Sequence, residues 1–471
     1  WSIHLMVRIQ DSQSWHRGSI PLSTTMKSSS FWMKTFFCFY FFGYFLFLFY
    51  LCRMKQMRIH NKFRGIALLA AFALSCGVGV AQRSEIHSSR VTTLQVVGGD
   101  NWLSMPVVTL GGQTVQVSFD DLTHDYHRYC YKIVHCDADW NESAGLFVSD
   151  YLAGFNGELT IDDFEESLNT NQLYTHYQLR IPNENCRITM GGNYKLMVYD
   201  ENRENEPMLT ACFMVVDPQV NVSVGYRSNT DIDVNKSHQQ VSVHVDYGNL
   251  RITDPQRQLR MVVLQNGRWD NAVCDPKPDY ISADGLQWTH CRDLIFPAGN
   301  VYRKFEMLDM NHTTMGLDEM KWDGNEFHAF VQPDLPRPSY VHDEAPQGSF
   351  FIRNSENIDN DFISDYAWVH FFLKAPRQKG DVYLNGDWTH DRFLPAYRME
   401  YDEKTQSYEG KVLMKQGYYS YQYLVLKDNG TTQPVTSEGS YFQTQNKYQV
   451  LVYYRGTGDR TDRLVGFKDV K

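Results

Sequence analysis

The sequence has none of the short signatures that mark the common catalytic sites. It contains no Gly-x-Ser-x-Gly elbow, no His-Glu-x-x-His, no phosphate-binding lysine loop and no Cys-x-x-Cys. Helical signals are also scarce, because few stretches combine Ala, Leu, Glu and Lys and no helix-period segment exceeds about two turns. These absences argue against the enzyme classes that the motifs mark and against a helical fold.

What the sequence does have is a pattern of short strands. Of its 471 residues, 42% are apolar and 14% are aromatic. At roughly 100–200 residues per domain, this length allows two to four domains. Aromatic and β-branched residues favour strands, and past residue 90 they recur in short alternating runs between turns, as in 115–119, 129–134 and 177–181. The pattern predicts an all-β protein of tandem immunoglobulin-like or early-set β-sandwiches.

Turn and proline signals divide this β pattern into three parts. A first sandwich is expected over 91–217, since a strand at 212–216 ends at Asp217-Pro218. A second is expected over 218–338, ending in the proline-rich stretch 332–338, which reads as a linker or edge. The remainder, 339–471, is expected to be a third sandwich whose last strand is 448–454.

The N-terminal region predicts export. The sequence begins with Trp rather than Met, and Met57 opens a positively charged stretch followed by an apolar stretch at 66–78 and small residues before Gln82. This order is that of a secretory signal peptide over 57–81, so residues 1–56 are expected to be a non-native upstream extension. Two alternatives remain: acylation of Cys76, and a membrane span over the apolar segment 35–52, which is just long enough.

Charge and cysteine content constrain the partners. Residues 1–81 carry nine of the 45 Lys and Arg residues and one of the 55 Asp and Glu residues, so the rest of the chain has a net charge of −18. An acidic body argues against nucleic acid and anionic membrane surfaces. Six cysteines lie past residue 81 and export permits disulfides, but the pairing cannot be deduced. Cys130 and Cys136 are about 20 Å apart along one expected strand and cannot bridge each other.

Three polar groupings are candidates for chemistry. His, Cys and Asp residues between His124 and Asp139 could ligate zinc, although alternation places His127 and Cys130 on opposite faces of a strand. Asp359 and Asp361, with Asp365 nearby, offer oxygens for calcium but lack the glycine and distal Glu of an EF-hand loop.

Adjacent acids form the third grouping, at 120–121, 162–163 and 165–166. Glycoside hydrolysis needs two carboxylates, but adjacent acids on turns more often only solvate a surface. No catalytic, cofactor-binding or metal-binding residue is therefore assigned from the sequence.

The third part offers one binding alternative. Residues 382–388 and 416–423 resemble the early-set sandwiches that include glycogen-binding modules, which stack sugars on exposed aromatic rings. Trp388, Tyr419 and Tyr421 could form such a platform in a periplasmic or surface glycan-binding protein. The competing interpretation places these rings in the core or in cross-strand pairs.

Longer phrases of the sequence resemble the plug protein family of the type IX secretion system. The opening phrase is 129–140 (YCYKIVHCDADW), and others follow in the family's order over about 91–466: 169–170 (NT), 174–177 (YTHY), 192–194 (GNY), 238–240 (HQQ), 265–269 (QNGRW), 298–300 (AGN), 365–366 (DY), 415–419 (KQGYY) and 438–439 (EG).

The resemblance implies a non-enzymatic component of protein secretion. Plug proteins sit on the periplasmic side of the outer membrane, dock on the large translocon β-barrel and close its channel. The expected partner is therefore that barrel, with no nucleic acid, no small-molecule substrate, no cofactor and no membrane insertion of the mature chain. A third interpretation is a secreted cargo of the same system. Cargo carries a separable C-terminal sorting domain, whereas 448–454 reads as an integral strand.

Overall fold

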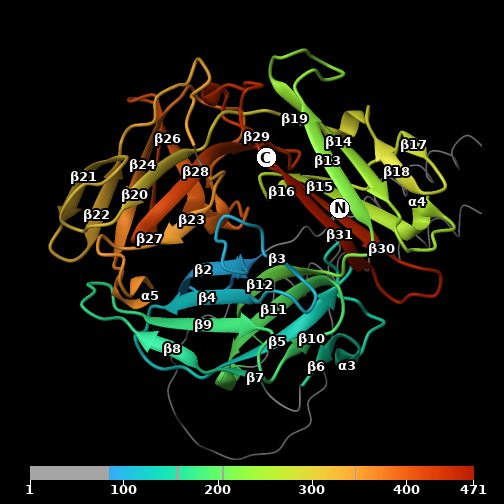
Figure 1. Ribbon diagram of the computed structural model, residues 1–471. Helices are drawn as coiled ribbons and strands as arrows, with labels where there is room; N and C mark the ends of the chain where they lie inside the picture. The colour runs from blue at the N-terminus through green and yellow to red at the C-terminus, as the bar shows by residue number, and fades with distance from the viewer. Residues whose placement is uncertain (1–83, 155–158, 204–205, 345) are drawn as a thin grey trace, which may run out of the picture. The chain divides into compact units, whose positions relative to one another are not determined.

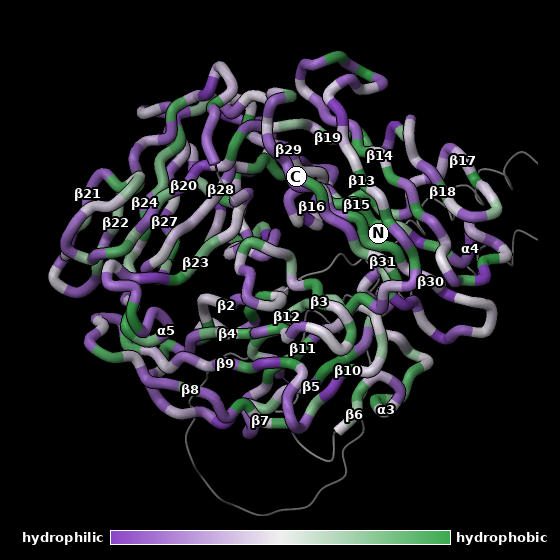
Figure 2. The backbone as a smooth tube through the Cα atoms, in the orientation of Figure 1, coloured by the Kyte–Doolittle hydropathy of each residue, from purple (hydrophilic) through white to green (hydrophobic). Residues whose placement is uncertain are grey.

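The computed structural model describes residues 84–154, 159–203, 206–344 and 346–471, all within the compact unit Gly79–Lys471 (Figure 1). The predictions for the extension 1–56, the signal peptide 57–81, Cys76 and the apolar segment 35–52 lie outside the described residues. The all-β prediction is confirmed, because nearly every described element is a strand. Hydrophobic residues are concentrated in the strands and hydrophilic residues in the loops (Figure 2).

The first sandwich consists of two mainly antiparallel sheets. Their strand orders are β2-β4-β9-β8 and β1-β12-β11-β5-β7, with β3 pairing in parallel with β12. The bounds are β1 (Glu85–Ile86), β2 (Val91–Gly98), β3 (Val107–Thr109), β4 (Val115–Asp121), β5 (Tyr129–Cys136), β7 (Leu159–Ile161), β8 (Asp163–Glu166), β9 (Thr175–Ile181), β11 (Gly192–Asp200) and β12 (Pro207–Val216). A two-stranded sheet, β6 (Leu152–Ala153) and β10 (Arg187–Ile188), lies apart from both.

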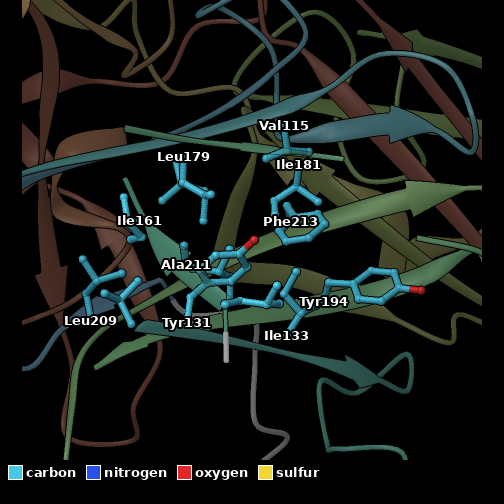
Figure 3. Packing of buried hydrophobic residues seen from close by; sticks show 14 of the residues in the cluster. Val115, Tyr131, Ile133, Ile161, Leu179, Ile181, Tyr194, Leu209, Ala211 and Phe213 are labelled. Carbon is cyan, nitrogen blue, oxygen red and sulfur yellow. The ribbon is translucent and has the colours of Figure 1, made fainter. Parts of the chain in front are cut away.

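Period-two alternation explains the core of this sandwich. Along β9, Tyr177, Leu179 and Ile181 are buried, whereas Arg180 points to the other face and is exposed. Side chains of β4 and β9 face those of β5, β11 and β12 across one hydrophobic cluster, as Figure 3 shows for Val115, Leu179, Tyr194 and Phe213, among others.

The second sandwich is assembled from two distant parts of the chain. One sheet has the order β13-β14-β18-β17, with β19 also on β14, and the other has the order β16-β15-β30-β31. The bounds are β13 (Asn221–Arg227), β14 (His238–Asp246), β15 (Leu259–Gln265), β16 (Arg268–Cys274), β17 (Tyr280–Ile281), β18 (Gly285–Trp288), β19 (Ile295–Pro297), β30 (Tyr448–Tyr454) and β31 (Arg463–Val470). Strand β15 pairs with β30 over its whole length, from Leu259↔Tyr454 to Gln265↔Tyr448.

The central strands of the sheet β16-β15-β30-β31, β15 and β30, are buried on both faces over most of their length. Every residue of β30 is buried. Its Val450 and Val452 pack into the core of the second sandwich, whereas Leu451 and Tyr453 pack against the first sandwich. Alternate side chains therefore enter two different cores, and this sheet is the layer that the two sandwiches share.

The third sandwich is a ten-stranded sheet that closes around one core. Its main order is β20-β28-β25-β26-β27-β24-β22-β21, with β23 and β29 also paired to β28. The bounds are β20 (Arg303–Met307), β21 (Leu317–Trp322), β22 (Phe327–Val331), β23 (Phe350–Ile352), β24 (Tyr366–Lys374), β25 (Asp381–Asn385), β26 (Arg398–Asp402), β27 (Ser407–Lys415), β28 (Gly417–Leu426) and β29 (Thr432–Pro434).

Two of the expected domain boundaries differ from the observed strand pairing. Strands β20, β21 and β22 belong to the third sandwich, not to the second, and β30 belongs to the second, not to the third. The proline-rich stretch 332–338 is not a linker, because Asp334 bridges to Leu373 and is buried. Alternation in the sequence shows that a strand exists but not which strand it pairs with. No sequence pattern near β30 could therefore predict that it pairs with β15.

Helical turns are short and lie at strand ends. They are α3 (Val148–Tyr151), α4 (Pro255–Gln258), α5 (Asn360–Ile363) and the 3₁₀ turns η2 (Glu201–Arg203), η3 (Arg292–Leu294), η4 (Asp387–Thr389), η5 (Pro395–Tyr397) and η6 (Thr436–Glu438). Within the described ranges, no helix has the length and hydropathy that a membrane span requires.

Candidate functional site: the contacts among the three sandwiches

A buried ion pair joins the first sandwich to the third. Nζ of Lys415, at the end of β27, lies 2.6 Å from Oδ2 of Asp120 on β4, and both side chains are 1% exposed. Asp120 also accepts hydrogen bonds from the Tyr366 hydroxyl and from Nδ1 of His176, each at 2.6 Å. Burial on its own would raise the pKa of Asp120, but Lys415 and His176 hold that pKa below its ordinary value. The carboxylate is therefore ionised and has three donors.

The ammonium of Lys415 is equally well partnered. It also donates a hydrogen bond to the Asp361 carbonyl at 2.6 Å, and it lies 4.0 Å from the ring centroid of Tyr174. The Tyr174 hydroxyl in turn donates to the Ser364 carbonyl at 2.7 Å. A buried charge is tolerated only when it is paired and hydrogen-bonded, and here both sandwiches supply the partners.

A second carboxylate fixes the neighbouring loop of the first sandwich. Asp365 accepts the backbone N–H of Asn171 at 2.6 Å and that of Gln172 at 3.0 Å. Its own N–H donates to Oε1 of Gln416 at 2.7 Å. The phrases 174–177, 365–366 and 415–419, far apart in the chain, thus meet at one contact together with Asn171 and Gln172, which the sequence did not reveal.

Between the first and second sandwiches the contact combines a hydrophobic cluster with polar contacts. Trp140, from the loop after β5, packs edge-on against Trp269 of β16, with ring centroids 5.6 Å apart. The surrounding buried cluster comes from β5, β12, β15, β30 and β31 and comprises Cys136, Ala138, Trp140, Cys212, Met214, Val216, Val262, Leu264, Trp269, Leu451, Tyr453 and Leu464.

Polar contacts also cross this boundary: Thr461 hydrogen-bonds to Ser143 and donates to Asp137, and the Ala138 N–H donates to Oδ2 of Asp462 at 3.0 Å. The Tyr453 hydroxyl donates to Oδ1 of Asn193 at 2.9 Å, and Nδ2 of Asn193 donates to the Asp137 carbonyl at 3.0 Å. Asp137, Asn193, Trp140 and Trp269 belong to the phrases 129–140, 192–194 and 265–269, whereas Tyr453 lies outside them.

The second and third sandwiches meet at Arg268. Its guanidinium contacts Asp270 at 2.5 Å, and the Asp270 carboxylate accepts a hydrogen bond from Thr432 of β29. The Trp269 N–H donates to Oδ2 of Asp391 at 3.0 Å. Trp269 therefore contacts the first sandwich through its ring and the third through its backbone.

A cavity of about 130 Å³ lies where the three sandwiches meet. It is lined by Met105 from the first sandwich, Lys447 from the second and Asp387, His390 and Asp391 from the third, among others. Burial, and next the charge of Asp391, raise the pKa of Asp387 to about 7. Burial, and next the charge of Asp270, raise that of Asp391 to about 6. The cavity thus holds two carboxylates that are only partly compensated.

The predicted sugar platform is not present on the surface. Trp388, Tyr419 and Tyr421 are 9%, 2% and 1% exposed and belong to the core of the third sandwich. Tyr421 also donates its hydroxyl to buried Asp334 at 2.8 Å. The platform prediction was wrong, because the face of β28 that carries Tyr419 and Tyr421 points into the core and a buried ring cannot stack on a sugar.

The candidate zinc residues are dispersed. His124 contacts the Tyr174 carbonyl, His127 contacts Thr123, and His135 contacts Ser143 in the interior. Cys136 lies in the core, where burial raises its pKa to about 12. Among the described residues, one group of three His or carboxylate side chains has its ligand atoms within 4.8 Å of one another, and it lies elsewhere, at Asp323, Glu326 and His328.

The other acidic candidates have separate positions. Asp120 and Asp121 are fully buried, so the expectation that these adjacent acids solvate a surface was wrong for this pair. Asp359 and Asp361 line a pocket with Asp163 and Glu165, and Asp365 is occupied by the backbone donors described above. Sequence spacing could not show that β4 turns its outer face towards another sandwich.

The fold and these contacts define an all-β protein of three sandwiches that contact one another through buried residues. Comparison with known families gives a match over residues 91–217 to the model described as "Type 9 secretion system plug protein 1st domain". The chain belongs to the type IX secretion system plug family, a family of structural secretion components rather than of known enzymes. The predicted family is therefore confirmed.

A solved structure gives the same fold over most of the chain. It is the crystal structure of a hypothetical protein from Parabacteroides merdae ATCC 43184, with 40% sequence identity and a TM-score of 0.79. The match covers 82% of this chain and 98% of that one. No curated protein matches the chain.

Proposed function

We propose that this protein docks on the periplasmic side of the outer-membrane translocon barrel of the type IX system and closes its channel. Family membership gives the secretion system. A plug acts sterically, so it must not deform when cargo or solvent presses on it. The observation that best supports this action is the shared sheet β16-β15-β30-β31, whose central strands pack into the core of the second sandwich on one face and against the first sandwich on the other.

The buried pair Asp120–Lys415 adds to this rigidity. Separating the first and third sandwiches would break this ion pair together with the hydrogen bonds that both sandwiches supply to it. These contacts therefore oppose relative motion of the two sandwiches. The protein would act as one block whose affinity for the barrel depends on the state of the barrel.

Co-purification tests the docking step. A tagged full chain, purified from outer membranes in mild detergent, should bring down a very large β-barrel protein. The same tag on an unrelated periplasmic protein is the control. Absence of the barrel under conditions that preserve other outer-membrane complexes would contradict the proposal, and recovery of the chain from culture medium would favour a secreted cargo.

Conductance tests the closing step. The isolated barrel in a planar bilayer should conduct, and addition of the purified chain to one side should abolish the current. A chain that binds the barrel but leaves the current unchanged would be a docking partner and not a plug. The glycan-binding alternative has lost its platform, since its three aromatic rings are buried.

A further inference from the structure

The hairpin of β21 and β22 gathers side chains that the proposed function does not use. Trp322 pairs with Phe327, so residues 323–326 form the turn. Oδ1 of Asp323 accepts the backbone N–H groups of Asn325 and Glu326, both at 2.8 Å. These bonds fix the Asp323 carboxylate and leave Oδ2 directed away from the turn.

A histidine on β22 faces that oxygen. Nε2 of His328 lies 3.2 Å from Oδ2 of Asp323, and the His328 side chain is 18% exposed. Ligand atoms of Asp323, Glu326 and His328 all lie within 4.8 Å of one another. The three groups come from one tight hairpin, so little of their arrangement depends on distant parts of the chain.

A second histidine orients the first. Nδ1 of His328 lies 2.9 Å from Nε2 of His370 on β24, the strand that pairs in parallel with β22. His370 is stacked on Phe330 at 4.4 Å between centroids. Its Nε2 can then accept the Nδ1 proton of His328, which leaves Nε2 of His328 as a lone-pair donor beside two carboxylates.

We propose that Asp323, Glu326 and His328 bind a divalent transition metal ion of the zinc type. Nε2 of His328 and one oxygen from each carboxylate supply three ligands, and water fills the remaining positions. An imidazole nitrogen favours Zn²⁺, Ni²⁺ or Co²⁺ over Ca²⁺ and Mg²⁺, which prefer oxygen ligands alone. His370 is a positioning residue, since a metal-binding His usually donates its other N–H to a partner that fixes its tautomer.

The location gives the site a structural consequence. Nδ2 of Asn171, in the first sandwich, donates to the Asn325 carbonyl at 3.2 Å. The turn that would hold the ion is thus also a contact between the first and third sandwiches. Bound metal would stabilise this turn, whether or not the chain plugs a barrel.

Calorimetric titration of the full chain with ZnCl₂ tests the site. The wild-type protein should bind one equivalent more than His328→Ala, and Glu326→Gln should weaken that site at least about tenfold. His370→Phe should weaken it by about 10–100-fold, the usual effect of losing such a partner. The matched control is His312→Ala, because Nδ1 of His312 also lies 2.9 Å from a carboxylate, that of Asp309.

Two further measurements test which ion the site prefers and whether the ion stabilises the fold. CaCl₂ and MgCl₂ at the same concentrations should give no saturable heat, and Zn²⁺ should raise the melting temperature of the wild-type protein but not that of His328→Ala. If His328→Ala fails to fold, Asp323→Asn takes its place. Equal zinc binding by the wild-type protein and the folded site variants, or no zinc binding by the wild-type protein, would overturn the proposal.

Discussion

The indole of Trp140 meets that of Trp269 at 88°, with ring centroids 5.6 Å apart, although the two residues belong to different sandwiches. Trp140 is 1% exposed and Trp269 is 7% exposed. Edge-to-face packing of this kind adds about 0.5–1.5 kcal/mol to the stabilisation from burial alone. The pair therefore lies at the centre of the contact between the first and second sandwiches.

Replacing Trp269 with Ala should destabilise the protein by about 3–5 kcal/mol, because the change leaves a cavity against Trp140. Urea unfolding followed by circular dichroism measures the loss. Trp322→Ala is the control, since Trp322 is 48% exposed on β21. Equal losses of unfolding free energy in the two variants would show that the contact between Trp140 and Trp269 adds nothing to stability.

Lys415→Met should cost about 3–5 kcal/mol of stability, because Asp120 would remain buried without its cation. The double variant Asp120→Asn, Lys415→Met should lose less than Lys415→Met alone, since no buried charge is left unpaired. Chemical unfolding of the wild-type protein, of these two variants and of Asp120→Asn alone completes a double-mutant cycle. Strict additivity of the two single changes would contradict an energetic link between these side chains.

Asp387→Asn should stabilise the protein at about pH 8 and have little effect at about pH 4. The folded-state pKa of Asp387 is raised to about 7. Between the ordinary carboxyl pKa and about pH 7 the folded protein therefore keeps a proton that the unfolded chain releases, so stability falls as the pH rises across that interval and the loss is complete above it. Melting temperatures at both pH values check this, with exposed Asp428→Asn as the control. A loss of stability at about pH 8 would contradict it.

Trp388→Ala should lower stability by about 3–5 kcal/mol without changing affinity for any polysaccharide, because Trp388 packs in the core of the third sandwich. Trp368→Ala, on the partly exposed face of β24, should cost less. Urea unfolding and affinity electrophoresis in glycogen gels measure the two properties. Retarded migration of the wild-type protein that Trp388→Ala abolishes would restore the glycan-binding interpretation.

Alternation of apolar and polar residues predicted the individual strands, but it did not predict which strands pair or pack together. Alternation over 115–119, 129–134 and 177–181 identified β4, β5 and β9 correctly, because a half-buried strand repeats every two residues. The same period could not tell which face of β28 was inward, so Tyr419 and Tyr421 were placed on a sugar platform. Strand β30 was recognised as a strand but assigned to the wrong sandwich.

The candidate site was hidden for a related reason. Asp120 occupies the alternate face of β4, which would be solvent-facing in a lone sandwich, and only the packing of β24 and β27 against it makes that face an interior. The cluster at Asp323, Glu326 and His328 requires a hairpin register, Lys321↔His328, that no spacing rule specifies. The family phrases 174–177, 365–366 and 415–419 contain the partners of Asp120 but did not indicate that these residues meet, and no phrase covers 323–328.

The return of β30 to β15 makes the third sandwich an insertion in the second. Its two ends are tied together, since the Gly299 N–H donates to the Ser440 hydroxyl and the Tyr441 N–H donates to the Gly299 carbonyl. During synthesis β15 has no strand partner on one side until 448–454 has emerged. The third sandwich can therefore fold first, while the apolar edge of β15 stays unpaired. Folding of the second sandwich is thus delayed by nearly 200 residues of chain (Leu259↔Tyr454), an interval during which a chaperone would have an exposed strand to hold.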